Sequence, residues 1–226
     1  MKSKLWSNNP LPRHNAKPIN KNGIGFSMDD FGNSAPNVTP ILESTRPPEE
    51  IARLVNWRKS KGIKANDILN IGRQGHRQIE RFLNGENMPC SSLLEPYWNK
   101  LLPTLQELHH IRLVEGNVFN FYKGYAGRVD CVGRLYDLPE CAIEFKFSDE
   151  IKPIHESTKL QVAAYIGALN RQYGPPCGVK ITQGIVIVTT PNEVDINLLD
   201  EVEVMKYWKQ WENKVERFWN LQKFAA

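Results

Sequence analysis

The sequence has few cysteines and no long apolar run. No pair among its four cysteines has the CxxC spacing of a redox or metal motif, and no stretch approaches the roughly 18 apolar residues of a membrane span. We therefore expect no membrane association, and reduced thiols in a cytosol-like compartment. The cysteines are Cys90, Cys131, Cys141 and Cys177.

Acidic residues are absent from the first 21 positions, which carry five basic ones. This balance resembles an organellar leader, but Pro10, Pro12 and Pro18 would disrupt an amphipathic helix. We therefore expect residues 1–38 to form a flexible basic arm, or a strap over the domain that follows. The expected setting is the cytoplasm of a bacterial or viral system rather than an organelle.

The bulk composition is that of an ordinary globular chain. Its 226 residues suit one domain with an appendage, and 41% hydrophobic and 24% charged residues are typical values. The net charge of +4 is compatible with a nucleic-acid partner but does not require one.

Helical patterns precede and follow a region with strand-like patterns. Residues 48–109 are expected to hold three helices, the second over about 65–83 and the third kinked at Pro103. Three successive strands are expected between 111 and 147, and one more at 184–190. Further helices are expected at about 157–173 and 199–224. The predicted fold is α/β, with a central mixed sheet flanked by helices and an N-terminal helical segment.

The chemistry is concentrated in two segments, Gly127–Asp130 and Cys141–Lys146. Side chains alternate along a strand, so Glu144 and Lys146 share one face while Ile143 and Phe145 point to the core. The preceding turn brings Asp130 back towards Glu144. Two carboxylates beside a lysine suit Mg²⁺ or Mn²⁺ and phosphate chemistry. The plainer interpretation is a solvated strand edge.

Two further pairs strengthen the functional interpretation. Gln161 and Tyr165 lie four residues apart on one helix face, directly after this strand. His76 and Glu80 follow Gly72 on the second helix, where His76 interrupts a small or apolar face. A lone histidine there is more often a core residue, but beside an acid pair it becomes a candidate metal ligand.

The ordered series GxxxHxxxE, GRVD, ExK and QxxxY resembles the RecB-like branch of the PD-(D/E)XK (restriction-endonuclease-like) nuclease superfamily, most of all the mitochondrial genome maintenance exonucleases. The resemblance covers roughly residues 38–220. It implies a nuclease domain at 39–226, made of a helical segment 48–109, a catalytic core 111–190 and a C-terminal helix 199–224. Val129 stands where the superfamily formula has proline.

The resemblance also implies roles for residues. It implies a metal site of His76, Asp130, Glu144 and the Phe145 carbonyl, with Glu115 matching an acid near the metal. Asp130, Glu144 and Lys146 match the catalytic set, while Gln161 and Tyr165 match a motif that supports the active site and the DNA. Some relatives hold an iron–sulfur cluster, but the cysteines here are too scattered, so we expect none. The expected cofactor is Mg²⁺, with Mn²⁺ as a substitute.

Basic side chains surround these motifs. Arg73, Arg77 and Arg81 recur every four residues, as a solvated helix face or a phosphate-guiding stripe. Arg128, Lys152 and Lys159 are further candidate DNA contacts.

The function predicted from the sequence is a metal-dependent exonuclease acting on single-stranded DNA or DNA ends, in replication, repair or recombination. Two alternatives remain open at this point: a structure-specific endonuclease on the same core, and a catalytically inactive DNA-binding module.

Overall fold

The computed structural model describes residues 5–61, 63–86 and 88–224. Its main sheet has five strands in the order β4-β5-β6-β7-β8, and a separate three-stranded sheet has the order β1-β2-β3. In chain order the elements are β1 (Lys17–Lys21), β2 (Ile24–Met28), β3 (Ser34–Pro36), α1 (Val38–Ser44), α2 (Pro48–Lys61), α3 (Ile63–Leu83), α4 (Glu95–Gln106), β4 (Leu108–Asn120), β5 (Tyr125–Leu135), β6 (Cys141–Phe147), α5 (Glu156–Cys177), β7 (Gln183–Thr189), β8 (Val194–Leu199) and α6 (Glu201–Phe224).

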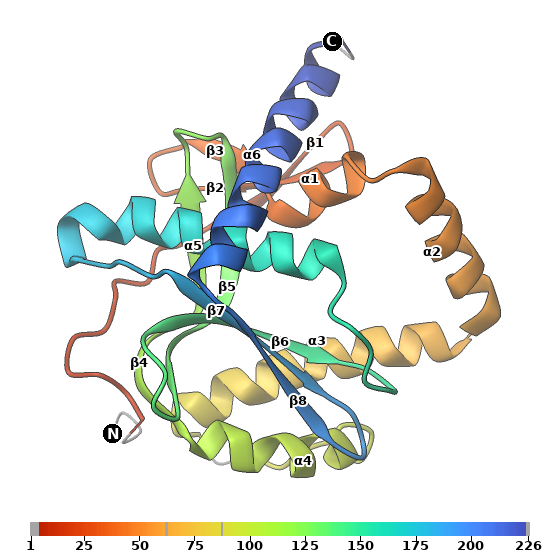
Figure 1. Cartoon of the computed structure of the whole chain (residues 1–226), viewed down its shortest axis with the longest axis vertical. Helices are drawn as coiled ribbons and strands as arrows, with labels where there is room; N and C mark the ends of the chain where they lie inside the picture. The colour runs from red at the N-terminus through yellow and green to blue at the C-terminus, as the bar shows by residue number, and fades with distance from the viewer. Residues whose placement is uncertain (1–4, 62, 87, 225–226) are drawn as a thin grey trace.

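Helices cover both faces of the main sheet, which confirms the predicted α/β class. One core lies between the sheet and α1, α5 and α6, and the other between the sheet and α3 and α4 (Figure 1). Strands β6 and β7 are parallel and joined through α5, whereas the other neighbouring strands are antiparallel. The mixed sheet therefore places α5 directly over the end of β6.

The predicted helices and strands of the catalytic region are present. The three strands expected between 111 and 147 are β4, β5 and β6, and the expected strand at 184–190 is β7. Trp208, Trp211, Val215 and Phe218 recur at helical spacing in α6, which predicts a core-facing stripe, and Trp211 and Phe218 are fully buried. Helix α4 continues through Pro103.

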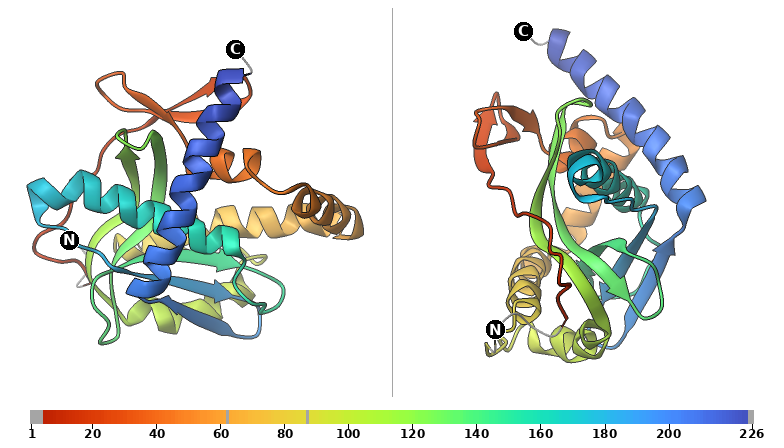
Figure 2. Two further views of the ribbon diagram at one scale, coloured as in Figure 1. Left: turned by 45° about the horizontal axis from the view of Figure 1, so that its top comes forward. Right: turned by 90° about the vertical axis from the view of Figure 1, so that its left-hand side faces the viewer.

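The expectation of a flexible arm at residues 1–38 is wrong for most of this segment. Residues 17–36 form the β1–β3 sheet, whose first turn has positive φ at Asn22 and Gly23, the pattern of a tight hairpin. Residues 5–16 form the strap that was the other possibility. Ser7 and Leu11 donate backbone hydrogen bonds to β4, beside which the strap runs (Figure 2, right).

Among the described residues, no helix has both the length and the apolar character needed to cross a membrane.

A close approach between α3 and β6 sets the position of the helix. Gly75 lies so near the Phe147 ring that a Cβ atom there would overlap it, whereas a Cβ at Gly72 would meet nothing within 4 Å. Replacement by alanine should therefore lower the stability of the protein at Gly75 and raise it at Gly72. It also follows that His76, the next residue, is placed by this contact.

We expect Gly75→Ala to destabilise the protein by about 1–3 kcal/mol through overpacking. Gly72→Ala, the matched control, should stabilise it by up to about 1 kcal/mol because alanine favours helix. Urea unfolding of both variants measures the difference. Equal effects of the two substitutions would contradict the packing argument.

Candidate active site

Three carboxylates lie side by side across three neighbouring strands. In the β4–β5 ladder, Val114 pairs with Cys131 and Gly116 with Val129, which sets Glu115 opposite Asp130. The last β5–β6 pair is Cys131 with Ile143, and one step beyond it Asp130 faces Glu144. All three acids are buried, and all line one cavity of about 850 Å³.

The end of the β5–β6 ladder explains how Asp130 is held. Where the two strands separate, the Phe145 N–H has no β5 carbonyl to bind, and it donates instead to Asp130 Oδ2 at 2.8 Å. In a strand, the N–H and C=O of one residue point to the same side, so the Phe145 carbonyl faces the side of Asp130. This is the carbonyl that the family resemblance implies as a metal ligand.

Helix α3 brings His76 to this row of acids. Its Nδ1 lies 3.3 Å from Asp130 Oδ1 and 3.4 Å from Glu115 Oε1. His76, Glu115 and Asp130 offer ligand atoms within 4.8 Å of one another. Glu115 therefore lies within reach of the same cation as His76 and Asp130.

Glu144 belongs to a second set of contacts in the same cavity. Its Oε1 accepts from Lys146 Nζ at 2.7 Å and from Gln161 Nε2 at 2.9 Å. Gln161 Oε1 also accepts from Lys146 at 3.2 Å, and Gln161 Nε2 lies 2.9 Å from the Tyr165 hydroxyl. Gly127 leaves room for the Tyr165 ring, which a Cβ there would overlap. The two α5 residues thus fix the carboxylate and the lysine of β6.

Electrostatics shift the ionisation of each group. Burial raises the pKa of Glu144, and the charge of Asp130 raises it further, while Lys146 opposes both. Burial alone would lower the pKa of Lys146, but Glu144 raises it, so this amine stays charged. Burial likewise lowers the pKa of His76, yet Asp130 and Glu115 outweigh it and raise that pKa to about 10.

These observations fit a bound divalent cation. Like charges on facing strand positions repel, and here three carboxylates lie on three adjacent strands. Glu144 Oε2 is buried and accepts no hydrogen bond among the described residues. A hard cation would offset this repulsion and satisfy the free oxygen, since carboxylate oxygens are the ligands that Mg²⁺ and Mn²⁺ prefer.

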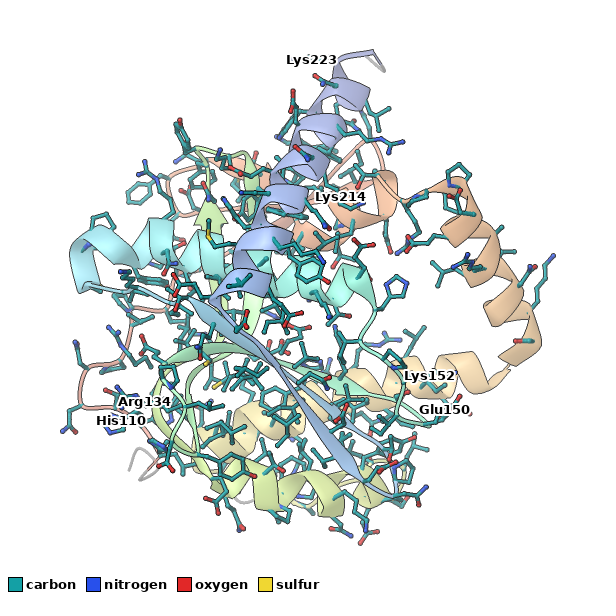
Figure 3. All side chains as sticks on the ribbon, in the orientation of Figure 1. His110, Arg134, Glu150, Lys152, Lys214 and Lys223 are labelled. Atoms are coloured by element: carbon teal, nitrogen blue, oxygen red, sulfur yellow. The ribbon has the colours of Figure 1, made fainter. Side chains whose placement is uncertain are left out.

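The predicted basic residues divide into two groups. Arg73 and Arg77 of α3 and Arg128 of β5 line the active-site cavity, and Arg128 Nε forms a 2.8 Å ion pair with Glu115 Oε2. The others do not line it. Arg81 lies near Glu86, Lys159 pairs with Glu203, and Lys152 pairs with Glu150 on the loop after β6 (Figure 3).

The sequence alone did not indicate Arg13, a strap residue. Arg13 bridges Glu80 Oε1 at 2.9 Å and the Glu115 carbonyl at 3.3 Å. It therefore ties α3 to β4 beside the acids. Glu115 has a φ of 47°, a strained conformation for a residue with a side chain, and such strain is common at functional sites. Asn37 and Asn117, which also line the cavity, carried no motif signal.

Comparison with known proteins finds relatives that share one name. "Mitochondrial genome maintenance exonuclease 1" of Mus musculus is 28% identical over 210 residues, covering 84% of this chain and 61% of the relative. The Homo sapiens and Xenopus tropicalis proteins of that name are 26% and 25% identical, over 82% and 81% of this chain and 58% and 57% of their own lengths. The predicted resemblance is confirmed. The chain spans about three-fifths of the length of these relatives.

No protein-family model matches the chain. A solved structure from Eubacterium rectale covers 71% of it at 10% identity, with a TM-score of 0.48. The relatives correct one expectation. A bacterial or viral cytoplasmic setting is contradicted, because all three are animal proteins whose name places them in mitochondrial genome maintenance.

Metal binding should depend on pH through His76. The raised pKa means that its ring carries a proton at neutral pH, and that proton must leave before Nδ1 can bind a cation. Protons then compete with metal, so Mn²⁺ affinity should rise with pH, by up to about tenfold per unit.

We expect the rise of Mn²⁺ affinity with pH to be shallower in His76→Ala, where the raised pKa of Glu144 supplies what remains of it. The variant should also change the preference between Mg²⁺ and Mn²⁺, because imidazole is a softer ligand than carboxylate. Calorimetry with Mn²⁺ at several pH values measures it. His109→Ala, in a histidine at the start of β4, is the control. An unchanged slope in His76→Ala would make His76 a structural residue.

Proposed function

We propose that this protein is a divalent-metal-dependent DNA exonuclease that hydrolyses single-stranded DNA or DNA ends. The observation that carries the proposal is the row of Glu115, Asp130 and Glu144 across three strands, with the charged amine of Lys146 beside it. The shared name of the relatives supports it, and favours an organellar role in DNA maintenance.

The residues of the cavity would have separate roles in metal binding and in catalysis. His76, Asp130, Glu144 and the Phe145 carbonyl, together with Glu115, would hold the cation. Once bound, the cation supplies Lewis acidity, which polarises a phosphate and makes water a better nucleophile. Lys146, kept charged by Glu144, would stabilise the negative charge that develops on the phosphate. Gln161 holds the Lys146 amine and the Glu144 carboxylate in place by hydrogen bonding to both.

The entry path would be basic. Two arginines of α3 line the cavity, Arg73 about one turn before His76 and Arg77 directly after it, and both can draw a phosphate backbone towards the acids. A substrate that enters by a free end would pass beneath α3, the part of the helical segment that lines the cavity, and a duplex is wider than a single strand. We therefore propose single-stranded DNA with a free end as the substrate.

Linear and circular forms of the same single strand test this proposal. With Mg²⁺ or Mn²⁺, the linear form should be degraded and the circle should persist, and a chelator should stop the reaction. Protein carrying Asp130→Asn, purified in parallel, controls for contaminating nuclease. Rapid cutting of the circle would indicate an endonuclease, and binding without any cutting would indicate an inactive DNA-binding module. Strands labelled at either end would give the polarity.

A further inference from the structure

A second hollow, of about 320 Å³, lies on the side of β4 that also carries part of the active-site cavity. Side chains two residues apart on a strand share a face. Asn117 lines the active-site cavity, and Phe119, next along that face, lines the second hollow together with Phe121 of the turn that follows β4. At about 3.3 Å per residue, Asn117 and Phe119 are about 7 Å apart along the strand.

Exposed aromatic rings form the wall of this hollow. Phe31 is 90% exposed, Tyr122 77% and Phe121 41%. Phe121 is stacked on Phe119, with ring centroids 5.1 Å apart and an angle of 21° between the planes, so its ring is supported from behind. Three exposed rings around one hollow are costly in water unless a partner covers them.

Charges around the rings favour a nucleotide over an apolar partner. Arg171 lines the hollow, and its guanidinium carbon lies 5.6 Å from the centre of the Tyr122 ring. The Lys123 amine lies at the same distance from this ring but is paired with Glu212 at 2.6 Å. The Arg171 guanidinium therefore suits a phosphate next to a stacked base. Asp30, which accepts from the Asn15 amide at 3.2 Å, lines the hollow and can accept from the amino groups of bases.

The strap connects the two hollows. Ala16 and Pro18 line the active-site cavity, and His14 and Asn15 line the second hollow. A strand that leaves the cavity across residues 14–18 therefore reaches the aromatic rings within a few nucleotides.

We propose that this hollow, formed around Phe31, Phe121, Tyr122 and Arg171, is a nucleobase-stacking subsite. It takes a base of the single-stranded nucleic acid that lies outside the active-site cavity. The inference rests on the proposed function, and it adds a second point of attachment that holds the substrate without taking part in cleavage.

The test measures binding with metal chelated, so that no cleavage occurs. The probes are a fluorescent dinucleotide, which is too short to occupy the active-site cavity and the second hollow together, and an oligonucleotide about 20 nucleotides long. Tyr122→Ala and Phe31→Ala should each weaken binding of the long probe about five- to a hundredfold, the usual effect of losing one base–aromatic stack. They should leave the dinucleotide affinity and its cleavage rate with Mg²⁺ unchanged. Tyr122→Trp should restore tight binding.

Two controls make the result specific. Val202→Ala, in an exposed apolar residue of α6, should have no effect. In the wild type, replacing the bases of the long probe one at a time by abasic sites should reveal one position whose loss weakens binding, and Tyr122→Ala should remove that sensitivity.

Unchanged long-probe affinity in both alanine variants would overturn the subsite while leaving the proposed function intact. Equal weakening of short and long probes would also overturn it, as would altered self-association of the variants without a change in nucleic-acid binding. A wild type that binds and cuts no nucleic acid would refute the proposed function itself, and the subsite with it.

Discussion

Asp130→Asn should fold normally and cut single-stranded DNA at least about a thousandfold more slowly than the wild type. Asp130 is the central acid of the row, within 3.3 Å of His76 Nδ1 and opposite both Glu115 and Glu144. Neutralising it removes a charged ligand from the middle of the metal site. Mn²⁺ affinity, measured by calorimetry, should fall by more than the 10–100-fold typical of an outer-shell partner.

Asparagine at position 130 allows loss of cleavage to be measured apart from loss of stability. Asp130 Oδ2 accepts the buried Phe145 N–H, and the asparagine oxygen can still do so. Asp130→Ala has no such oxygen, so the Phe145 N–H is left buried without an acceptor. This variant should therefore lose about 1–3 kcal/mol of stability as well as cleavage. Thermal unfolding of the two variants distinguishes them. An asparagine variant with more than a tenth of the wild-type rate would rule out Asp130 as a central ligand.

Lys146→Met should lose cleavage by about a hundred- to a thousandfold and yet keep its metal. Methionine has a similar length but no charge, so it cannot stabilise charge that develops on a phosphate. Lys146 is a cation beside the metal site, and removing it takes away repulsion of a second cation. Mn²⁺ affinity should therefore be unchanged or higher, the opposite of the result for Asp130→Asn. It is measured at mildly alkaline pH, so that Glu144, whose pKa is raised, is ionised in both proteins.

Single-turnover rates on a short labelled oligonucleotide, with calorimetry on the same samples, measure both quantities. Lys209→Met, in an exposed lysine of α6, serves as the matched control for removing one lysine charge. If Lys146→Met lost metal binding together with cleavage, its amine would have to be needed to build the site rather than to act on the phosphate.

The region from β4 to β6 could be predicted from the sequence because its signals are local. Strong strand formers occupy residues 111–147, short turns separate them, and Glu144 and Lys146 alternate with apolar neighbours. Strand alternation then places the lysine beside the acid. The contact of Gln161 with both of them depends on α5 lying over β6, for which the order of motifs along the chain was a sufficient guide.

Other elements were missed although some had a signal. Lys21-Asn22-Gly23-Ile24 contains the strongest short hairpin signal, but the short flanking runs hold proline, glycine and polar residues, so no alternation supports it. β8 alternates Val194, Ile196 and Leu198 with polar residues, yet it lies next to the start of α6 and was not recognised. Arg13 contacts Glu80 and Glu115 only through the tertiary fold, which no local pattern records.

The placement of the acids by strand register has a consequence for how this region can vary. Each of the three carboxylates comes from a different strand, and backbone pairing determines their alignment. A residue inserted within β5 would turn Asp130 to the opposite side, because successive side chains alternate. A residue inserted in the turns at 121–124 or 136–140 would leave the alignment intact. Natural length variation should therefore be confined to the hairpin loops, while the spacing inside the strands stays constant.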